Sequence, residues 1–302
     1  MNRREFATAV FAGAMDSPPI PIIDTHIHLF DTRRPQGVPW PPKDNPILYK
    51  PALPDRYRRI AQPLGVVGAI EVEASPWLED NQWVLDLAAH DHILVGTIGD
   101  LEPGQREFPS QLERFHKNPL FRGIRYGNLW GRDLSARISD PVFLAHLKLL
   151  ARAGLVLDTA NPDTRLVAAV VRLSDRLPDL RIVLDHLPNL EIPTDPQARR
   201  AYEADLDHLR HRKQVFAKIS QVLQVKNRRE VLDQLWDVFG EDRVLYGSDW
   251  PNSDPFGTYA EVLAAVRPYV ESKGRAAAEK YFWKNSLTAY RWVKRDAAQP
   301  TA

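Results

Sequence analysis

Two histidines separated by a single residue, His26 and His28, end a short apolar run that begins at Ile22. Alternate side chains of a β-strand point to the same face, so the pattern predicts that Asp24, His26 and His28 share one face of a strand. Two imidazoles at the end of a strand can converge on one metal ion or on one oxygen of a substrate. The pair is therefore the first candidate for an active site.

More ionisable side chains stand at the ends of other apolar runs. In chain order they are Glu71 and Glu73, Arg125, Asp158, Asp185 and His186, Lys218, and Asp249. Burying so many charged groups among Val, Ile and Leu is costly unless the groups are paired, bind a metal or face a solvated pocket. Taken singly, each has an ordinary explanation: His186 is typical of a hydrogen-bonded core histidine, and Asp249 of a turn. A shared location would make them a site.

Eight apolar runs separated by helix-like stretches must position these residues. The runs are typical of strands and cover residues 22–28, 66–73, 93–98, 121–126, 155–158, 181–186, 215–220 and 243–251. Helices are predicted to begin at Asp140-Pro141 and at Asn161-Pro162, where Asp or Asn can cap the first turn. Two closing helices are predicted over residues 259–270 and 276–292.

The runs are apolar on both faces, which is typical of parallel strands covered on each side. Their alternation with helices predicts an α/β fold, a single (β/α)8 TIM barrel. A doubly wound open sheet is the alternative, but no Gly-x-Gly-x-x-Gly sequence follows any strand. Catalytic side chains of TIM barrels lie at the C-terminal ends of the strands, which is where the ionisable residues fall.

The composition limits the partners and cofactors to expect. The chain has 302 residues, with 40 Lys and Arg against 39 Asp and Glu, so no strong field favours nucleic acid or an anionic membrane. A small-molecule substrate is the expected partner, and the oligomeric state stays open. The chain has no cysteine, which excludes disulfides, thiolate metal sites and cysteine nucleophiles. A metal site must therefore use His, Asp and Glu.

The predicted boundaries place the barrel at residues 21–295, between an N-terminal extension at 1–20 and a tail at 296–302. Arg3-Arg4 precedes a short apolar stretch and Ala12-Gly13-Ala14, a pattern similar to a twin-arginine export signal. A plain extension explains the same residues, so cytoplasmic and exported locations both stay open. No stretch of about 18 apolar residues predicts a membrane span.

A proline-rich stretch at residues 35–54 follows the first strand and contains Trp40. So many prolines exclude a helix or a strand ladder and predict a long ordered loop, a feature that is usually functional in compact domains. Trp40 and Trp77, which follows the second strand, are candidates for contact with a substrate through their indole faces. Packing within the loops is the alternative for both.

Short motifs at the strand ends carry a family resemblance. They are His-x-His within 22–30, Val72-Glu73-Ala74, Gly123-Ile124-Arg125, residues 183–187, Lys218-Ile219-Ser220 and residues 247–251. In this order the chain resembles the amidohydrolase superfamily, of the amidohydrolase-2 type. It is most similar to the lactonase branch, which acts on sugar-acid lactones and pyrone dicarboxylate lactones.

The resemblance implies an enzyme that opens a lactone ring. Asp249 would be the general base that activates water, while His26, His28 and His186 polarise the carbonyl directly or through one metal ion. Arg125 and Lys218 are then candidates for binding a carboxylate or hydroxyl groups of the substrate, together with Trp40 and Trp77.

The resemblance also bears on metal content. Binuclear members carry a bridging lysine on the fourth strand and a histidine on the fifth, where this chain has Arg125 and Asp158, so two metals are disfavoured. One zinc-like divalent ion held by three histidines and one carboxylate fits the ligand chemistry. The candidate ligands are His26, His28 and His186, with Glu73 or Asp249. Metal-free action stays open, as does the role of Asp158.

Two alternatives belong to other functional classes. A metal-dependent decarboxylase of the same superfamily shares His-x-His, a later His and the terminal Asp, although residues 184–187 resemble the lactonases more closely. A barrel without catalysis that binds a ligand is the other, and it requires a blocked mouth or an Asp249 carboxylate engaged elsewhere.

Overall fold

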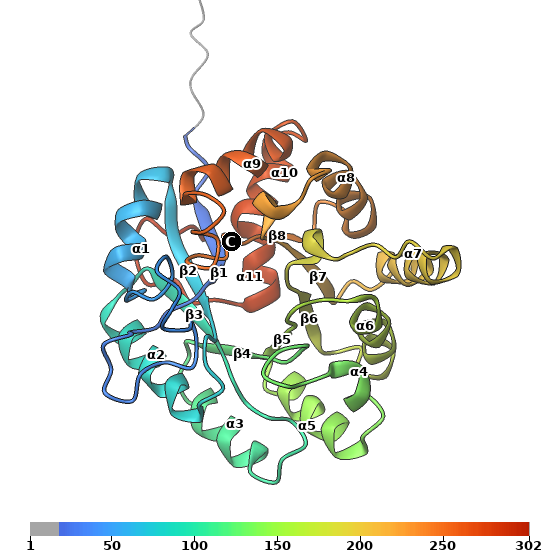
Figure 1. The fold of residues 1–302 in the computed structure, drawn as a ribbon, viewed down its shortest axis with the longest axis horizontal. Helices are drawn as coiled ribbons and strands as arrows, with labels where there is room; N and C mark the ends of the chain where they lie inside the picture. The colour runs from blue at the N-terminus through green and yellow to red at the C-terminus, as the bar shows by residue number, and fades with distance from the viewer. Residues whose placement is uncertain (1–17, 302) are drawn as a thin grey trace, which may run out of the picture.

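Eight parallel strands form one sheet whose order in space follows the order in the chain. The computed structural model describes residues 18–301, and its strands form a ring inside a layer of helices (Figure 1). The strands are β1 (Ile22–Ile27), β2 (Val66–Val72), β3 (Leu94–Gly99), β4 (Phe121–Arg125), β5 (Val156–Asp158), β6 (Arg181–Leu184), β7 (Val215–Ile219) and β8 (Val244–Tyr246). The predicted (β/α)8 TIM barrel is confirmed.

The helices follow the strands and cover the outside of the barrel. They are α1 (Pro54–Ala61), α2 (Leu78–His90), α3 (Phe108–His116), α4 (Leu134–Arg137), α5 (Pro141–Arg152), α6 (Thr164–Arg176), α7 (Pro196–Arg210), α8 (Arg228–Phe239), α9 (Tyr259–Glu271), α10 (Arg275–Glu279) and α11 (Asn285–Tyr290). Short 3-10 turns η1 (Gln62–Leu64), η2 (Leu187–Asn189) and η3 (Val222–Gln224) complete the connections. The proline-rich stretch after β1 is a loop, as predicted.

One of the two predicted helix starts is confirmed and the other is wrong. The Asp140 side chain accepts hydrogen bonds from the first turn of α5. The cap of α6 is instead Asp163, whose side chain accepts from the backbone N–H of Leu166. Asn161 lies before the helix with a positive φ of 48°, and its side chain donates to the carbonyl of Asn128. Asn161 therefore does not cap α6, and it lies close to the barrel mouth.

The predicted final helix over residues 276–292 is broken into three pieces. A π-helical turn, η4 (Lys280–Lys284), separates α10 from α11. Side chains from this C-terminal segment pack against the apolar residues that fill the lower half of the barrel. This floor cluster contains Ile23, Ile70, Val72, Val95, Ile98, Val156, Val183, Phe216 and Leu245 from the strands, with Trp283, Ala289, Tyr290 and Trp292 from the segment.

The seam between β8 and β1 closes the barrel at its mouth. The N–H of Asp249 donates to the carbonyl of His26 (2.9 Å), and the N–H of His28 donates to the carbonyl of Trp250 (2.7 Å). Ile27 and Trp250 form the parallel bridge between them. The backbone that closes the barrel thus fixes the first strand's histidines relative to Asp249.

The predicted shared face of Asp24 and the two histidines is wrong. The register between β1 and β2 shifts between Asp24 and Ile27, and this irregularity breaks the alternation of side chains. Asp24 accepts hydrogen bonds of 2.9 Å from the hydroxyls of Tyr57 on α1 and Tyr259 on α9, so it faces the helical layer. His26 and His28 face the mouth of the barrel. Asp24 therefore anchors β1 to its covering helices.

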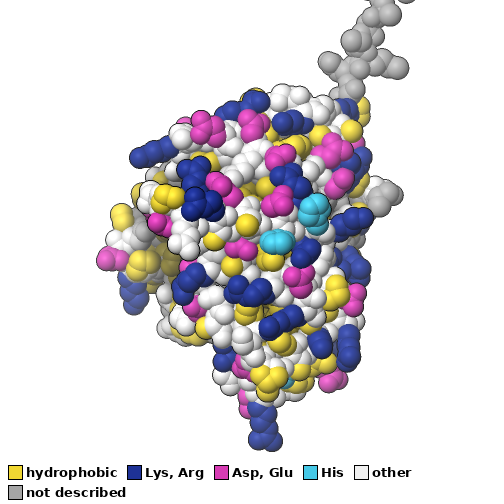
Figure 2. Space-filling model, turned by 90° about the vertical axis from the view of Figure 1, so that its right-hand side faces the viewer, with side chains coloured by type: hydrophobic (Ala, Val, Ile, Leu, Met, Phe, Trp, Pro, Cys, Tyr) yellow, Lys and Arg dark blue, Asp and Glu magenta, His cyan; other side chains and the backbone are white. Residues whose placement is uncertain are grey.

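Acidic and basic side chains are interspersed on the face of the molecule shown in Figure 2, as the balanced composition predicts. None of the helices within residues 18–301 has the length and apolarity needed to cross a membrane. The expected export-signal pattern at residues 1–14 lies outside the described residues. The proposed boundaries at 20 and 295 stay predictions.

Candidate active site

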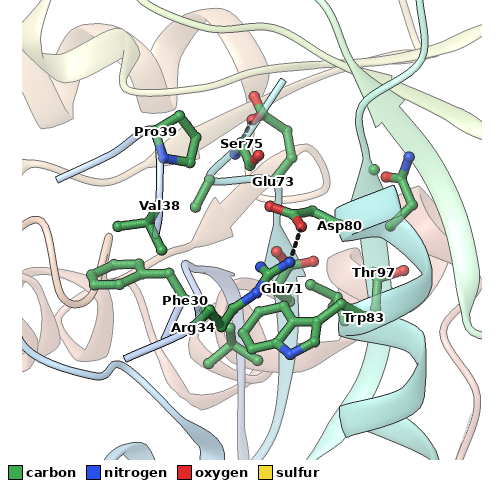
Figure 3. Close-up of a pocket in the computed structure, with 15 residues that line it drawn as sticks. Phe30, Arg34, Val38, Pro39, Glu71, Glu73, Ser75, Asp80, Trp83 and Thr97 are labelled. Carbon is green, nitrogen blue, oxygen red and sulfur yellow. Dashed lines mark hydrogen bonds and ion pairs between the residues drawn. The ribbon is translucent and has the colours of Figure 1, made fainter. Parts of the chain in front are cut away.

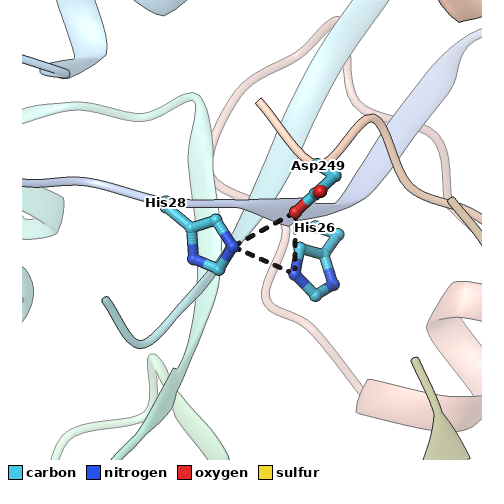
Figure 4. A group of neighbouring side chains, drawn as sticks. All are labelled: His26, His28 and Asp249. Carbon is cyan, nitrogen blue, oxygen red and sulfur yellow. Dashed lines mark hydrogen bonds and ion pairs between the residues drawn. The ribbon is translucent and has the colours of Figure 1, made fainter. Parts of the chain in front are cut away.

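Three side chains from opposite ends of the chain meet at the barrel mouth (Figure 4). Nε2 of His26 lies 3.2 Å from Nε2 of His28 and 3.5 Å from Oδ1 of Asp249, and His28 Nε2 lies 3.3 Å from the same oxygen. All three residues are buried. The structure thus brings together three of the predicted catalytic residues.

Asp249 is held on its other oxygen by two side-chain amides. Oδ2 accepts hydrogen bonds from Asn252 (2.8 Å) and Gln221 (3.0 Å). Burial opposes ionisation of the carboxyl, but the histidines around it outweigh this effect and hold the pKa of Asp249 below its ordinary value. Asp249 is therefore an oriented carboxylate, with Oδ1 facing His26 and His28.

His28 and His26 are oriented by groups behind them. Nδ1 of His28 lies 2.8 Å from the carbonyl of Val72, an acceptor, so this nitrogen carries a proton and Nε2 is bare when the ring is neutral. Burial and the neighbouring Lys218 lower the pKa of His26 well below its ordinary value. His26 is therefore a neutral imidazole.

His186 approaches the same carboxylate from β6. Its Nδ1 lies 2.7 Å from the hydroxyl of Ser220, and its Nε2 lies 3.9 Å from Oδ1 of Asp249. Burial lowers the pKa of His186 to about 4, so it too is neutral near pH 7. All four predicted catalytic residues are therefore neighbours.

Backbone strain marks the ends of three successive strands. His186, Gln221 and Asp249 follow β6, β7 and β8, and their φ angles are 55°, 55° and 60°. Non-glycine residues adopt this left-handed region at a cost of about 1–3 kcal/mol each, and such residues concentrate at active sites. The strain turns each of these side chains toward the others.

A buried ion cluster lies under His26. The ammonium of Lys218 is 2.7 Å from Oδ2 of Asp158 and 2.8 Å from Oδ1 of Asp185, and the hydroxyl of Tyr290 donates to the same oxygen of Asp158 (3.0 Å). Lys218 is 0% exposed and is absent from the residues that line the cavity at the mouth. The structure thus places Lys218 below the cavity, and its expected role in substrate binding stays a prediction. Asp158 likewise serves the ion cluster.

Arg125 is the cation that reaches the cavity. Its contacts are long: 3.4 Å to Asp185, 3.4 Å to the carbonyl of Thr159, 3.5 Å to His186 and 3.6 Å to Glu73. A buried guanidinium normally forms shorter hydrogen bonds, of about 2.7–2.9 Å to a carboxylate. Arg125 therefore has donors available for an oxygen atom of a ligand.

The cavity above these groups encloses about 630 Å³, including its part that is open to solvent. Its lining combines indoles, amides and the site's ionisable groups: His28, Trp40, Glu73, Ala74, Arg125, Leu129, Trp130, Asn161, His186, Gln221 and Asn252. Trp40 reaches it from the proline-rich loop, as expected. Trp77 is 38% exposed at the start of α2 and is not part of the lining, so the structure separates it from the other predicted substrate-binding residues.

A second, neighbouring cavity lies between β2, α2 and the loop after β1 (Figure 3). The ion pair of Arg34 with Asp80 (2.6 Å) and the ring of Trp83 line it, as do Glu71 and Glu73. Glu73 borders both cavities and accepts a 3.0 Å hydrogen bond from the indole N–H of Trp130. Burial raises the pKa of Glu73 to about 8. Glu73 therefore supports the wall of the substrate cavity as a carboxylic acid near pH 7.

The donor atoms of His26, His28 and Asp249 fit a single divalent ion. Ligands about 2.0–2.1 Å from a tetrahedral zinc ion lie about 3.3–3.4 Å apart, and the three atoms lie 3.2–3.5 Å apart. A second group that shares His26 joins it to Asp185 and His186. Within residues 18–301, Glu73 belongs to neither group of donor atoms, and His186 belongs only to the second.

Three residues of the cavity wall were not expected from the sequence: Gln221, Asn252 and Trp130. Asp185 was among the ionisable residues expected at the strand ends, although its place beside His26 was not specified. Asp185 offered the clearest signal, because it precedes His186 at the end of an apolar run. Gln221 and Asn252 follow strands as single amides, and nothing in their neighbourhood distinguishes them from ordinary loop residues.

Comparisons with known proteins match most of the chain to one family model and to several relatives. A family model described as Amidohydrolase matches residues 23–292. An L-fucono-1,5-lactonase of Burkholderia ambifaria is 27% identical over 257 residues, which cover 80% of this chain and 85% of the relative. A second one, of Burkholderia multivorans, is 24% identical and covers 86% and 92%. A solved amidohydrolase of Burkholderia multivorans with bound zinc superposes with a TM-score of 0.79 at 22% identity, over 90% of this chain and 100% of that one.

Proposed function

Because the chain belongs to the amidohydrolase family, we propose that it hydrolyses the ring ester of an uncharged sugar-acid lactone, with Asp249 as general base. The family confirms the predicted enzyme class, and the names of the two lactonase relatives support the predicted reaction. The geometry of Asp249 carries the assignment of roles. Two amides hold one of its oxygens while the other faces two imidazoles below the cavity.

The reaction begins when Asp249 takes a proton from a water molecule. The water oxygen then bonds to the carbonyl carbon of the lactone, and the carbonyl electron pair moves to its oxygen. An ionised carboxylate is needed for this step, and the lowered pKa of Asp249 keeps it ionised near pH 7. Gln221 and Asn252 prevent the carboxylate from rotating away.

Arg125 stabilises the oxyanion that forms. Its guanidinium lines the cavity, is buried, and holds its present partners at 3.4 Å or more, so it can shorten a contact to a developing negative charge without losing a strong bond. When the intermediate collapses, the ring C–O bond breaks. Asp249 returns its proton to the departing alkoxide, and the product is an open hydroxy acid.

A divalent ion held by His26, His28 and Asp249 would polarise the lactone carbonyl and acidify water when bound. The roles of Asp249 as base and Arg125 as oxyanion partner follow from this chain's own side chains. Both roles are the same whether or not the three donor atoms hold a divalent ion.

The charges that line the cavity favour an uncharged polyol over a dicarboxylate. Arg125 is the one cationic side chain among the lining residues, and its charge already faces the carboxylate of Asp185. Binding two carboxylates would require further cations. Amides from Asn161, Gln221 and Asn252 can instead bind hydroxyl groups. The indoles of Trp40 and Trp130 suit the C–H surface of a sugar ring.

A lactone panel tests the proposal. Uncharged five- and six-membered sugar-acid lactones, a pyrone dicarboxylate lactone and candidate aromatic acids are incubated with the purified protein, and proton release and carbon dioxide release are measured. We expect proton release with sugar lactones, and its loss in Asp249→Asn. Faster opening of the dicarboxylate would contradict the substrate class. Carbon dioxide release would establish the decarboxylase alternative, and silence in both assays would favour the binding barrel.

A further inference from the structure

Lys218 has three polar neighbours, two acidic side chains and one imidazole. Its ammonium lies 2.7 Å from Asp158, 2.8 Å from Asp185 and 3.1 Å from Nδ1 of His26, and the residue is completely buried. A lysine ammonium has three donors and no acceptor. Nδ1 of His26 must therefore present its lone pair to Lys218.

This contact determines where the proton of His26 lies. A neutral imidazole carries one proton, so with Nδ1 acting as an acceptor the proton is on Nε2. The Nε2 atom lies 3.2 Å from the bare Nε2 of His28 and 3.5 Å from Oδ1 of Asp249. One proton thus faces two acceptors, in the space between the three atoms whose spacing fits a zinc ion.

The carboxylate of Asp185 competes with Lys218 for Nδ1 of His26. Oδ2 of Asp185 lies 3.5 Å from Nδ1 of His26, and among the described residues neither oxygen of Asp185 accepts a well-aligned hydrogen bond. If the proton moved to Nδ1, Asp185 would be its acceptor, and the lone pair of Nε2 would face His28 and Asp249. A carboxylate behind a histidine is the usual support of a metal ligand.

We infer that Lys218 is a positioning residue that holds His26 with its proton on Nε2 and so weakens the affinity of His26, His28 and Asp249 for a divalent ion. Asp185 favours the opposite tautomer, and Lys218 prevails because its contact with Nδ1 is shorter by 0.4 Å. The spacing of the three donors suits a metal, while the hydrogen bond from Lys218 suits a metal-free site. The inference concerns the site's protons and metal affinity, and it requires nothing of the substrate.

The tautomer can be read directly in the native protein. Protein labelled with ¹⁵N-histidine and dialysed against a chelator is studied by long-range ¹H–¹⁵N correlation NMR, and the signals of His26 are assigned from their loss in His26→Gln. We expect an unprotonated, pyridine-like Nδ1 and a protonated Nε2 on His26. A protonated Nδ1 in the metal-free protein would overturn the inference without any substitution at Lys218.

Zinc titration tests the consequence. Removing Lys218 alone leaves the buried carboxylate of Asp158 without a cation, so the variant to use is Lys218→Met with Asp158→Asn, which removes one charge of each sign. By calorimetry we expect it to bind zinc about 10- to 100-fold more tightly than the native chain and than Asp158→Asn alone. In the zinc-loaded variant, Nδ1 of His26 becomes protonated. Unchanged affinity would contradict the inference.

Arg125→Met is the matched control for charge. Arg125 is another buried cation beside Asp185, but it makes no contact with His26. If the gain in zinc affinity came only from removing a positive charge, Arg125→Met would show it as well. An equal gain in both variants would overturn the role of Lys218, and a gain confined to the Lys218 variant supports it. Thermal unfolding of each variant confirms that the protein titrated is folded, and the native-protein NMR experiment stands independently of any variant.

Discussion

The two halves of the barrel interior differ in almost every physical respect. The lower half holds the floor cluster of aliphatic and aromatic side chains, closed by the C-terminal segment. The upper half holds ionisable groups, including Asp158 and Asp185 with carboxylate oxygens that lack well-aligned hydrogen bonds. Three left-handed residues end the strands there, whereas φ is negative throughout the floor cluster. The same strands thus provide stability at one end and strain at the other.

This difference assigns separate tasks to the two halves. Burial of apolar surface contributes about 25 cal/mol per Å², so the floor cluster stabilises the fold. The mouth uses part of that stability to keep charged groups dry and oriented, which strengthens their electrostatic effect on a substrate. Substitutions should therefore affect turnover at the mouth and stability at the floor.

Asp249→Asn should abolish most turnover while the fold persists. Loss of a general base lowers kcat by about 10²- to 10⁴-fold. The asparagine keeps the size of the side chain, so the thermal unfolding midpoint should change little. Steady-state kinetics with an accepted lactone and calorimetric unfolding measure both. Asp254→Asn, which breaks an ion pair with Arg56 outside the site, is the matched control. A loss of less than tenfold in Asp249→Asn would remove it as the base.

Phe216→Ala should lower stability while turnover per folded molecule persists. Phe216 is a buried member of the floor cluster, and truncating such a residue costs about 3–5 kcal/mol of unfolding free energy through lost burial and a new cavity. Turnover per folded molecule, measured below the lowered midpoint, should stay within about twofold. A kcat that falls in parallel with stability would show that the two halves are coupled.

Arg125→Met should lower kcat by about 10²- to 10³-fold, because the oxyanion loses its buried donor. Arg125→Lys keeps the charge but not the planar arrangement of donors, and we expect it to recover only part of the loss. A change confined to KM would instead assign Arg125 to ground-state binding of the substrate.

The pH dependence of stability should report the carboxyl groups at the mouth. Burial raises the pKa of Glu73 to about 8, so the folded state keeps a proton that the unfolded chain has already lost. Stability therefore falls as pH rises from about 6.5, where histidines of the unfolded chain are half deprotonated, to about 8, by up to about 1.4 kcal/mol per pH unit for each such group. Burial also raises the pKa of Glu71, which adds to the fall.

Glu73→Gln isolates one of these groups. The amide cannot ionise, so the decline in unfolding free energy between pH 6.5 and 8 should become shallower, while Glu71 maintains the remainder. Denaturant titrations at half-unit pH intervals measure the slope. Glu113→Gln on exposed surface is the matched control and should leave the slope unchanged. An unaltered slope in Glu73→Gln would place its ionisation outside this range.

The sequence predicted the fold well because the strands are local apolar runs. Each predicted strand overlaps an observed one, and the floor cluster follows from the same runs. The irregularity in β1 could not be predicted, since it depends on the register with β2 and on the seam with β8. The true cap of α6 was missed because Asn161 and Asp163 both suit the role, and only the packing of the mouth decides between them.

The sequence predicted which residues gather at the site better than it predicted how far below the cavity each of them lies. His26, His28, His186 and Asp249 meet as expected, because strand ends of one barrel face each other. Lys218 was a candidate for substrate binding, because a sequence shows a cation at a strand end but not how far below the cavity it lies. Gln221 depends on a left-handed backbone after β7, which no local pattern signals.

The two tryptophans at the rim provide the smallest and most selective test. Trp77 was one candidate for contact with substrate, but it is exposed and is not among the residues that line the cavity, so Trp77→Ala should change KM by less than about twofold, in keeping with a surface substitution. Trp130 lines the cavity and donates its indole N–H to Glu73. Stacking on an aromatic ring is worth about 0.5–1.5 kcal/mol, so Trp130→Ala should raise KM about 2- to 10-fold. If Trp77→Ala instead matched Trp130→Ala, the substrate would extend past the cavity onto α2, and the mouth would be wider than its lining residues indicate.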